Sequence, residues 1–597
     1  MRRCAWLVVG ALVAGAGCGG SGRDEVDAAL ADAGAGADAG DGGGDGAVSP
    51  DAGTLLMPVW DPTRLAWPMF AQNPRRTGRS PWNGPRAATT HALWTYTATG
   101  GSSINIQPVV SEDGAYFATW GVSRRMAMTD PATSWLKFDG AYYGLHLDDR
   151  GSPAAQRLYA PLDPRPLPYC YVYAPHPHQT RDDVCMASNL LVTFGNGTIE
   201  GTALIDPDTR VHYVGRGDGR LYAINPGGTL RWTYDTFNPE EPADPDGGGE
   251  IIGGPVMGPG KRLYFGTFGV PWPGTASNPA YETHAVYALT SDGQLAWRYP
   301  RATARLDNPI AAAPALSADE RTLYVATYFE DGSRPGRLMA LDLTRPDGAS
   351  DAERLRWELA LDNPARVGAP RLWVRHLSVG IDGVIYLGCG EAKVGGSAPA
   401  VVAVRDEGSR GRVAWLAEPQ DFATSMATIV QGLALWEDAG AVVRIYVATA
   451  HLRDANGTGG RLYVLDPATG ATQASFDPET ATPAGLGGLT SPTLGNDETV
   501  YVGIRGRHDN LAQPNLGQWR RGRMYALRRN AAGTGFDVSW SFEAQGLLDW
   551  SHPAIGANGL LYFGDTDQFS PFLDQNTFFA PGAATPRHDP HFYALGE

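Results

Sequence analysis

Five carboxylates in the segment 238–250 have the chemistry of a calcium site, because Ca²⁺ prefers oxygen ligands. An EF-hand loop places its acids at alternate positions, followed by a glycine and a distal glutamate. The acids here do not follow that order: Glu240, Glu241, Asp244, Asp246 and Glu250. We interpret the segment as a solvated acidic loop.

Two histidine pairs could offer imidazole nitrogens to a metal, His176 with His178 and His588 with His591. Each pair has a proline between its members, and no third ligand stands nearby in the sequence. Zinc sites in proteins need at least three side chains with converging donors. We therefore predict no metal site at either pair.

The sequence also gives little support for a hydrolase site or an adhesion site. A hydrolase of the common type needs a G-x-S-x-G elbow, and the chain has none. The tripeptide Arg216-Gly217-Asp218 is similar to an adhesion motif, but it directly precedes a Leu-Tyr-Ala strand and is interpreted as a tight turn. The residues alone thus predict no catalytic, cofactor-binding or metal-ligating side chain, and a protein that is not an enzyme.

The chain has five cysteines. Cys170 and Cys185 lie in one irregular stretch and could form a disulfide in an oxidising compartment, with two free thiols as the alternative. Cys389 lies in an apolar segment and is predicted to be a buried strand residue.

The N-terminus has the features of an export signal. Arg2 and Arg3 precede an apolar run, 5–16, that is too short to span a bilayer. Small residues then lead to Cys18, which resembles the lipidated cysteine of a bacterial lipobox, although Gly15 stands where a leucine is usual. We predict a lipoprotein-type signal peptide over 1–18 with Cys18 as the lipid attachment site; an ordinary signal peptide is the alternative.

Residues 19–60 are predicted to form a disordered tether. They contain many Gly, Ala and Asp residues and no aromatic residue before Trp60, so they cannot bury a core. The whole chain has a net charge of −16, which argues against a nucleic-acid partner.

The rest of the chain, 61–597, repeats one unit, seen most clearly at 254–299. Each unit has a short apolar strand, a strand with a tyrosine, a Leu-Tyr-Ala-Leu strand and a tryptophan strand. The anchor tyrosines are Tyr116, Tyr213, Tyr264, Tyr324, Tyr386, Tyr446, Tyr501 and Tyr562. The spacing between the first two is 97 residues and the others lie between 51 and 62, which predicts an insertion within 139–200. The first unit is assigned to 107–138.

Four short strands cannot bury both faces of their sheet, whereas sheets packed radially can. We therefore predict an all-β fold, a single β-propeller of eight four-stranded blades, with seven as the alternative. The last unit lacks a tryptophan strand, and 91–96 supplies one with Trp94. An N-terminal strand is thus predicted to close the ring.

The segment 460–470, GRLYVLDPATG, resembles the tryptophan-docking repeat of quinoprotein-like propellers, and 67–81 resembles the lead-in that often precedes such repeats. That family includes quinone-dependent alcohol dehydrogenases and non-enzymatic lipoproteins of the BamB type. The enzymes hold pyrroloquinoline quinone (PQQ) over an aromatic ring with a Ca²⁺ and an aspartate base. No residue here could be assigned to those roles, and no Cys-Cys pair occurs.

We therefore predict, without a cofactor, a non-catalytic binding or scaffold lipoprotein of the outer membrane that faces the periplasm or the exterior. Its partners would be envelope proteins, as in outer-membrane protein assembly, or a surface ligand, and the chain would act as a monomeric module. A PQQ- and Ca²⁺-dependent dehydrogenase and a module for adhesion or polysaccharide binding are the alternatives.

Overall fold

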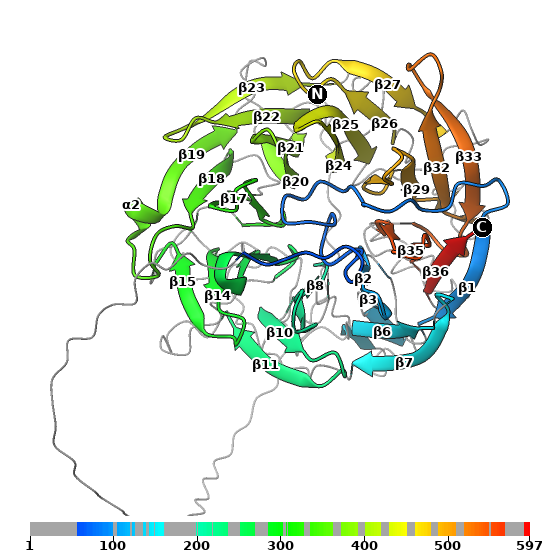
Figure 1. Ribbon diagram of the computed structural model, residues 1–597, viewed down its shortest axis with the longest axis horizontal. Coiled ribbons are helices and arrows are strands. Elements are labelled where there is room, and N and C mark those ends of the chain that lie inside the picture. Colours follow the sequence, from blue (N-terminus) through cyan, green and yellow to red (C-terminus); the bar gives the residue numbers. More distant parts are fainter. Residues whose placement is uncertain are drawn as a thin grey trace, which may run out of the picture. The chain divides into compact units, whose positions relative to one another are not determined.

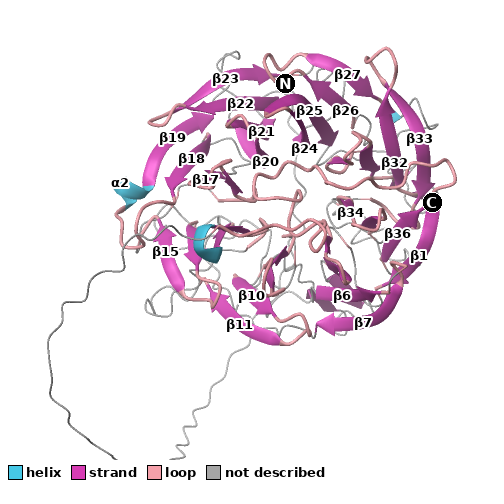
Figure 2. Ribbon diagram, in the orientation of Figure 1, coloured by secondary structure: helices cyan, strands magenta, loops and turns pink. Residues whose placement is uncertain are grey.

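The computed structural model describes the part of the chain given by residues 57–98, 104, 106–119, 122–125, 135–138, 142–148, 150–159, 199, 201–217, 219–236, 251–268, 284–301, 306, 309–327, 335–361, 372–391, 400–418, 429–450, 460–478, 488–508, 519–548, 551–566 and 590–597. Strands form nearly all of its regular structure (Figure 2). The described helical segments are α2 (Asp351–Arg354) and the 3-10 turn η2 (Pro259–Lys261). Neither of these is an apolar helix of membrane-spanning length.

Eight four-stranded antiparallel blades form a ring, and we number them blade 1 to blade 8 in chain order (Figure 1). One pair, Gly390 with Ile429, joins the sheets of blades 5 and 6. Blades 1 to 4 are β2 (Val109–Val110), β3 (Gly114–Ala118), β6 (Tyr142–Leu147), β7 (Pro153–Tyr159); β8 (Leu204–Ile205), β9 (His212–Gly215), β10 (Arg220–Ile224), β11 (Leu230–Asp235); β12 (Val256–Gly258), β13 (Arg262–Gly266), β14 (Val286–Leu289), β15 (Leu295–Tyr299); and β16 (Ala315–Leu316), β17 (Thr322–Ala326), β18 (Gly336–Asp342), β19 (Leu355–Leu361).

Blades 5 to 8 are β20 (Leu372–Val379), β21 (Val384–Glu391), β22 (Ala400–Asp406), β23 (Gly411–Ala417); β24 (Ile429–Asp438), β25 (Ala441–Ala450), β26 (Leu462–Leu465), β27 (Thr472–Phe476); β28 (Thr493–Leu494), β29 (Val500–Ile504), β32 (Arg523–Arg529), β33 (Phe536–Glu543); and β34 (Ala554–Ile555), β35 (Leu561–Gly564), β36 (His591–Gly596), β1 (His91–Thr97). The predicted all-β propeller with eight four-stranded blades is confirmed. β30 (Arg507–His508) and β31 (Trp519–Arg520) form a small separate sheet.

A row of three side chains explains the repeated Leu-Tyr-Ala-Leu and Trp pattern. In blade 3, Tyr264 pairs across the strands with Ala288, and Ala288 pairs with Trp297. Because alanine ends at Cβ, the two aromatic rings meet above it with their centroids 5.7 Å apart. The same row recurs in blades 2, 4, 5, 7 and 8 with centroid distances of 5.7–6.1 Å. All eight anchor tyrosines are buried on the second strand of their blade.

The tryptophans also bind the following blade. The Trp357 Nε1–H of blade 4 donates to Asp406 Oδ1 of blade 5 at 2.9 Å, and the Tyr324 hydroxyl donates to the other oxygen of that carboxylate at 2.8 Å. A Cβ on Gly411 would lie 2.6 Å from the Trp357 ring, so only glycine allows this approach. Equivalent Nε1–H bonds run from Trp232 to Ser291 O, from Trp415 to Pro467 O and from Trp94 to Gly151 O. The repeated residues therefore pack one blade against the next.

Blade 1 differs from the prediction. Its third and fourth strands were predicted within 126–138, but β4 (Val122–Arg125) and β5 (Trp135–Phe138) form a sheet of their own. The blade is completed by β6 and β7, which lie in the region predicted as an insertion. Gly144 of β6 lies opposite Tyr116 and leaves room for that ring as alanine does elsewhere. The assignment of 126–138 to this blade was wrong.

Blade 8 combines strands from both ends of the described chain. β1 pairs with β36, which lies between β1 and β35 (Figure 1). Trp94 lies opposite Ala594, and Ala594 lies opposite Tyr562, so these two segments complete the aromatic row. The Glu597 side chain also accepts bonds from the backbone N–H groups of Arg86 and Ala87.

The turns that join the first to the second strand are short, and so are those from the third to the fourth, except in blade 4, where residues 343–354 with α2 make this connection. In blade 8 the third and fourth strands, β36 and β1, are not joined by a turn. In blade 6, Asp466 Oδ1 accepts from the backbone N–H groups of Ala468 and Thr469, and Gly470 has φ 73°. This explains the Asp-Pro-Ala-Thr-Gly sequence, since the carboxylate satisfies turn N–H groups and glycine takes the left-handed conformation. Apart from residues 1–56, the long undescribed segments all belong to the other two kinds of connection.

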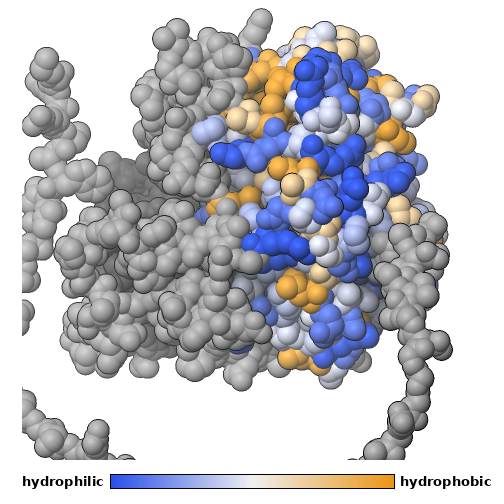
Figure 3. Space-filling model, turned by 90° about the vertical axis from the view of Figure 1, so that its left-hand side faces the viewer, coloured by the Kyte–Doolittle hydropathy of each residue, from blue (hydrophilic) through white to orange (hydrophobic). Residues whose placement is uncertain are grey.

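The outer strand β1 alternates between exposed and partly buried side chains over its seven residues. Some exposed positions are apolar, such as Leu230, Leu295 and Val413. Figure 3 shows the side of the ring that carries β11, β15 and β23, where hydrophobic residues are scattered among hydrophilic ones. Single apolar residues on a surface need no partner to explain them.

Candidate functional site

Residues 67–81, which we call the strap, cross the centre of the ring (Figure 1). This is the predicted lead-in segment. Its backbone bonds in turn to the inner strands of blades 1, 2, 4, 5, 6 and 7, through Trp67 with Val110, Pro68 O with Ile205 N, Pro74 O with Leu316 N, Arg75 O with Val379 N, Thr77 O with Leu435 N and Gly78 O with Leu494 N. Gln107 of blade 1 accepts from the strap's Ala71 N–H at 2.7 Å and donates to Pro553 O of blade 8 at 2.8 Å.

Arg76 connects the strap to blade 3. Its side chain is fully buried, and the guanidinium donates to four backbone oxygens at 2.8–3.2 Å: those of Phe70, Gly254, Pro255 and Pro314. Burial lowers the pKa of Arg76 to about 9, so the group remains a cation at neutral pH. The strap thus bonds directly to seven blades and is linked to blade 8 through Gln107. A buried positive charge lies at its middle.

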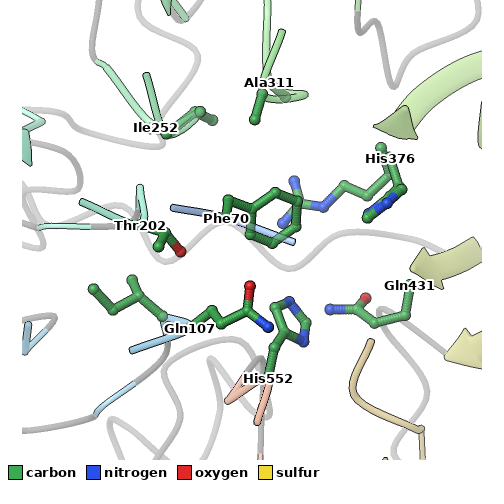
Figure 4. A pocket seen from close by; sticks show the side chains of 13 residues that line it. Phe70, Gln107, Thr202, Ile252, Ala311, His376, Gln431 and His552 are labelled. Carbon is green, nitrogen blue, oxygen red and sulfur yellow. The ribbon is translucent and has the colours of Figure 1, made fainter. Parts of the chain in front are cut away.

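A cavity lies beside the strap at the centre of the ring (Figure 4). Water centres can occupy about 80 Å³ of it, which is room for several water molecules. The Phe70 ring of the strap lies among the lining side chains in Figure 4. The polar lining consists of Gln107, Thr202, Arg375, His376, Gln431 and His552. The apolar and glycine lining consists of Ile106, Ile252, Gly253, Gly254, Ala311 and Ala313.

Six of the thirteen lining residues occupy one equivalent position of the repeat. It lies two residues before the inner-strand partner of each anchor tyrosine, and in blade order it holds Gln107, Thr202, Gly254, Ala313, His376, Gly432, Ser491 and His552. Sequence reasoning missed this position. A signal was present, because the residue directly precedes a proline in five of the units, at Gln107, Gly254, Ala313, Ser491 and His552.

The two buried histidines of the cavity are neutral. Burial lowers the pKa of both His376 and His552 to about 3. His552 Nδ1 accepts from Ser491 N at 2.8 Å, so its proton is on Nε2. Ser378 Oγ donates its one hydrogen to Arg76 O, so the 3.0 Å contact with His376 Nε2 requires that nitrogen to be the donor. His376 Nδ1 is therefore an acceptor.

These histidines predict a loss of stability in acid. Histidine in an unfolded chain titrates near pH 6.5, so between about pH 6.5 and 3 the unfolded state binds more protons than the folded state. The free energy of unfolding should fall as the pH is lowered through that window. His552→Gln should reduce the fall, measured by urea denaturation at several pH values, whereas His91→Gln at the exposed start of β1 should not. Equal pH dependence in the parent and His552→Gln would contradict this.

The calcium and quinone site implied by the family resemblance can be tested against this lining. Ca²⁺ needs a shell of oxygen ligands with carboxylates among them. The cavity lining offers two amides but no Asp or Glu, and Arg375 and the nearby Arg76 bring positive charge. Within the described ranges, no group of three His, Cys, Asp or Glu side chains could hold a metal. The residues present here do not fit a calcium-bound quinone.

Most of the residues singled out from the sequence lie outside the described part of the chain: Cys18, Cys170, Cys185, His176, His178, His588 and the acidic segment 238–250. Cys389 is a free, buried thiol on β21, as predicted, and burial raises its pKa. Arg216 and Gly217 lie in the turn between β9 and β10, as predicted. His591 begins β36.

Comparison with known proteins concerns the fold. No protein-family model and no curated protein matches the chain. Quinohemoprotein alcohol dehydrogenase from Comamonas testosteroni aligns with a TM-score of 0.51 and 12% identity over 89% of this chain and 81% of its own. Quinohemoprotein alcohol dehydrogenase ADHIIG from Pseudomonas putida HK5 gives 0.51 and 12% over 90% and 80%. BamB from Moraxella catarrhalis gives 0.43 and 13% over 85% and 100%. The chain therefore has the propeller fold of the quinohemoprotein alcohol dehydrogenases.

Proposed function

We propose that this chain is a non-catalytic binding or scaffold protein of the cell envelope, a lipoprotein attached through Cys18. Its propeller presents a rigid ring to an envelope protein or a surface ligand. One such role is in the assembly of outer-membrane proteins. The chain acts as a monomeric module of a larger assembly.

The chemistry of the central cavity supports binding rather than catalysis. A general base works best with a pKa near the operating pH. His376 and His552 have a pKa of about 3 and are too weak to take a proton from a substrate at neutral pH. The lining has no carboxylate to serve instead. What it offers is a fixed set of hydrogen-bonding groups, which is suited to recognition.

A calorimetric titration of the full chain with PQQ, with and without Ca²⁺, tests this proposal. We expect no heat of binding and no dye-linked oxidation of alcohols or sugars, because the cavity lacks the oxygen ligands for the metal. Cofactor-free quinohemoprotein alcohol dehydrogenase titrated in the same way is the positive control. Tight, Ca²⁺-dependent, one-to-one binding with dye reduction would overturn the proposal in favour of a quinoprotein dehydrogenase.

A further inference from the structure

The side-chain oxygen of Gln431, on β24, is a hydrogen-bond acceptor without a donor in the described chain. The residue is 5% exposed, it lines the cavity, and its Oε1 atom has no hydrogen-bond partner in the described chain. Figure 4 shows its amide extending into the cavity, toward His552. A buried acceptor without a donor destabilises the folded state, so it needs a reason to be there. A molecule in the cavity that donates a hydrogen bond would supply one.

The other polar groups decide what kind of molecule fits. His376 Nδ1 is a second acceptor, while the Gln431 amide nitrogen is a donor and the Thr202 hydroxyl is both. A carboxylate or sulfate ion brings only acceptors and leaves Gln431 Oε1 without a donor. A metal cation meets the acceptors but lies close to the positive charges of Arg375 and Arg76. A hydroxyl group both donates and accepts, and it carries no charge.

The apolar part of the cavity fits the same kind of molecule. The Phe70 ring lies with its centroid 5.4 Å from that of His376 and 5.9 Å from that of His552, so it forms an aromatic wall next to the polar groups. Ligand sites commonly combine such a wall with a few placed hydrogen-bonding groups. A sugar ring or cyclic polyol has C–H faces for the aromatic wall and hydroxyls for the polar groups.

We propose that the cavity beside the strap binds one neutral polyhydroxylated unit, a sugar or a polyol, through Gln431, His376 and Thr202 with Phe70 as the apolar wall. This inference rests on the proposed binding function and names the class of its ligand.

The test is binding of D-glucose, D-galactose, N-acetylglucosamine and myo-inositol to the full chain, measured by calorimetry and by ligand-observed NMR. At least one probe should bind, and Gln431→Leu should weaken it about tenfold or more, which corresponds to about 1.4 kcal/mol. Gln294→Leu, an exposed glutamine in the β14–β15 turn, is the matched control and should leave binding unchanged. The free Gln431→Leu protein should have a stability close to that of the parent, because the Oε1 atom that is removed has no hydrogen-bond partner within the described chain.

Three results would overturn the inference: no probe binds, Gln431→Leu binds the probe as tightly as the parent, or acetate or phosphate displaces the probe from the cavity. The last would make the cavity an anion site. None of these results bears on the proposal that the chain is not an enzyme. That proposal would be overturned by binding of PQQ together with dye reduction.

Discussion

Arg76→Met should lower the free energy of unfolding by about 3–5 kcal/mol. Hydrogen bonds from charged donors contribute about 1.5–3 kcal/mol each, and relief from burying a cation offsets part of their loss. The four carbonyl oxygens that accept from Arg76 belong to the strap and to blades 3 and 4, and methionine would leave them unpaired. Urea denaturation followed by near-ultraviolet circular dichroism measures the loss; if refolding is incomplete, the unfolding rate replaces it.

Arg64→Met is the matched control. The Arg64 side chain is 48% exposed and pairs with Glu112 at 3.4 Å, so its removal should change stability by about 0.5 kcal/mol or less. Arg76→Lys should recover only part of the loss, because an ammonium group cannot reach carbonyls spread over a guanidinium plane. Equal effects of the changes at Arg76 and Arg64 would show that the strap does not hold the blades together.

Trp357→Ala should also lower the free energy of unfolding by about 3–5 kcal/mol. The side chain is 5% exposed, it fills the space between blades 4 and 5, and its Nε1–H bonds to Asp406. Trp357→Phe keeps most of the ring and removes the N–H, so it should cost about 1–2 kcal/mol and leave the Tyr324 bond to Asp406 in place.

The difference between the two Trp357 variants separates ring packing from the hydrogen bond. Leu230→Ala, on the exposed face of an outer strand, is the control and should have little effect on the urea midpoint. If Trp357→Ala were as mild as Leu230→Ala, the contact between neighbouring blades would not depend on the docked tryptophan.

The repeat could be predicted because its geometry leaves a trace in every copy. Tyrosine and tryptophan can meet across a blade only if the residue between them is small, so Ala288, Ala340 and Ala526 recur with their aromatic neighbours. Blade 1 was misassigned because Trp135 matches this pattern by residue type. Strand pairing instead places Gly144 at the alanine position and Arg157 at the tryptophan position, and residue types alone do not carry that information.

A proline after the repeat position of Gln107 marks that position in five of the units, but the cavity itself could not be predicted from the sequence. Its residues share a position in the fold but not a residue type, so a search for a repeated motif discards them as variation. The bonds that fix them are also remote in sequence: Gln107 meets Pro553, and Ser378 meets Arg76. These segments come together only when the folded chain closes into a ring.

The pairing of β1 with β36 has a consequence for how the chain is made. Residues 91–97 are synthesised early, and their partner, 591–596, comes roughly 500 residues later. At about 5–20 residues per second, that interval is about 25–100 s. Throughout it, a strand that carries Trp94 and Leu93 has an open edge. Protection of this strand by a chaperone during synthesis and export would therefore matter more than for any other strand of the ring.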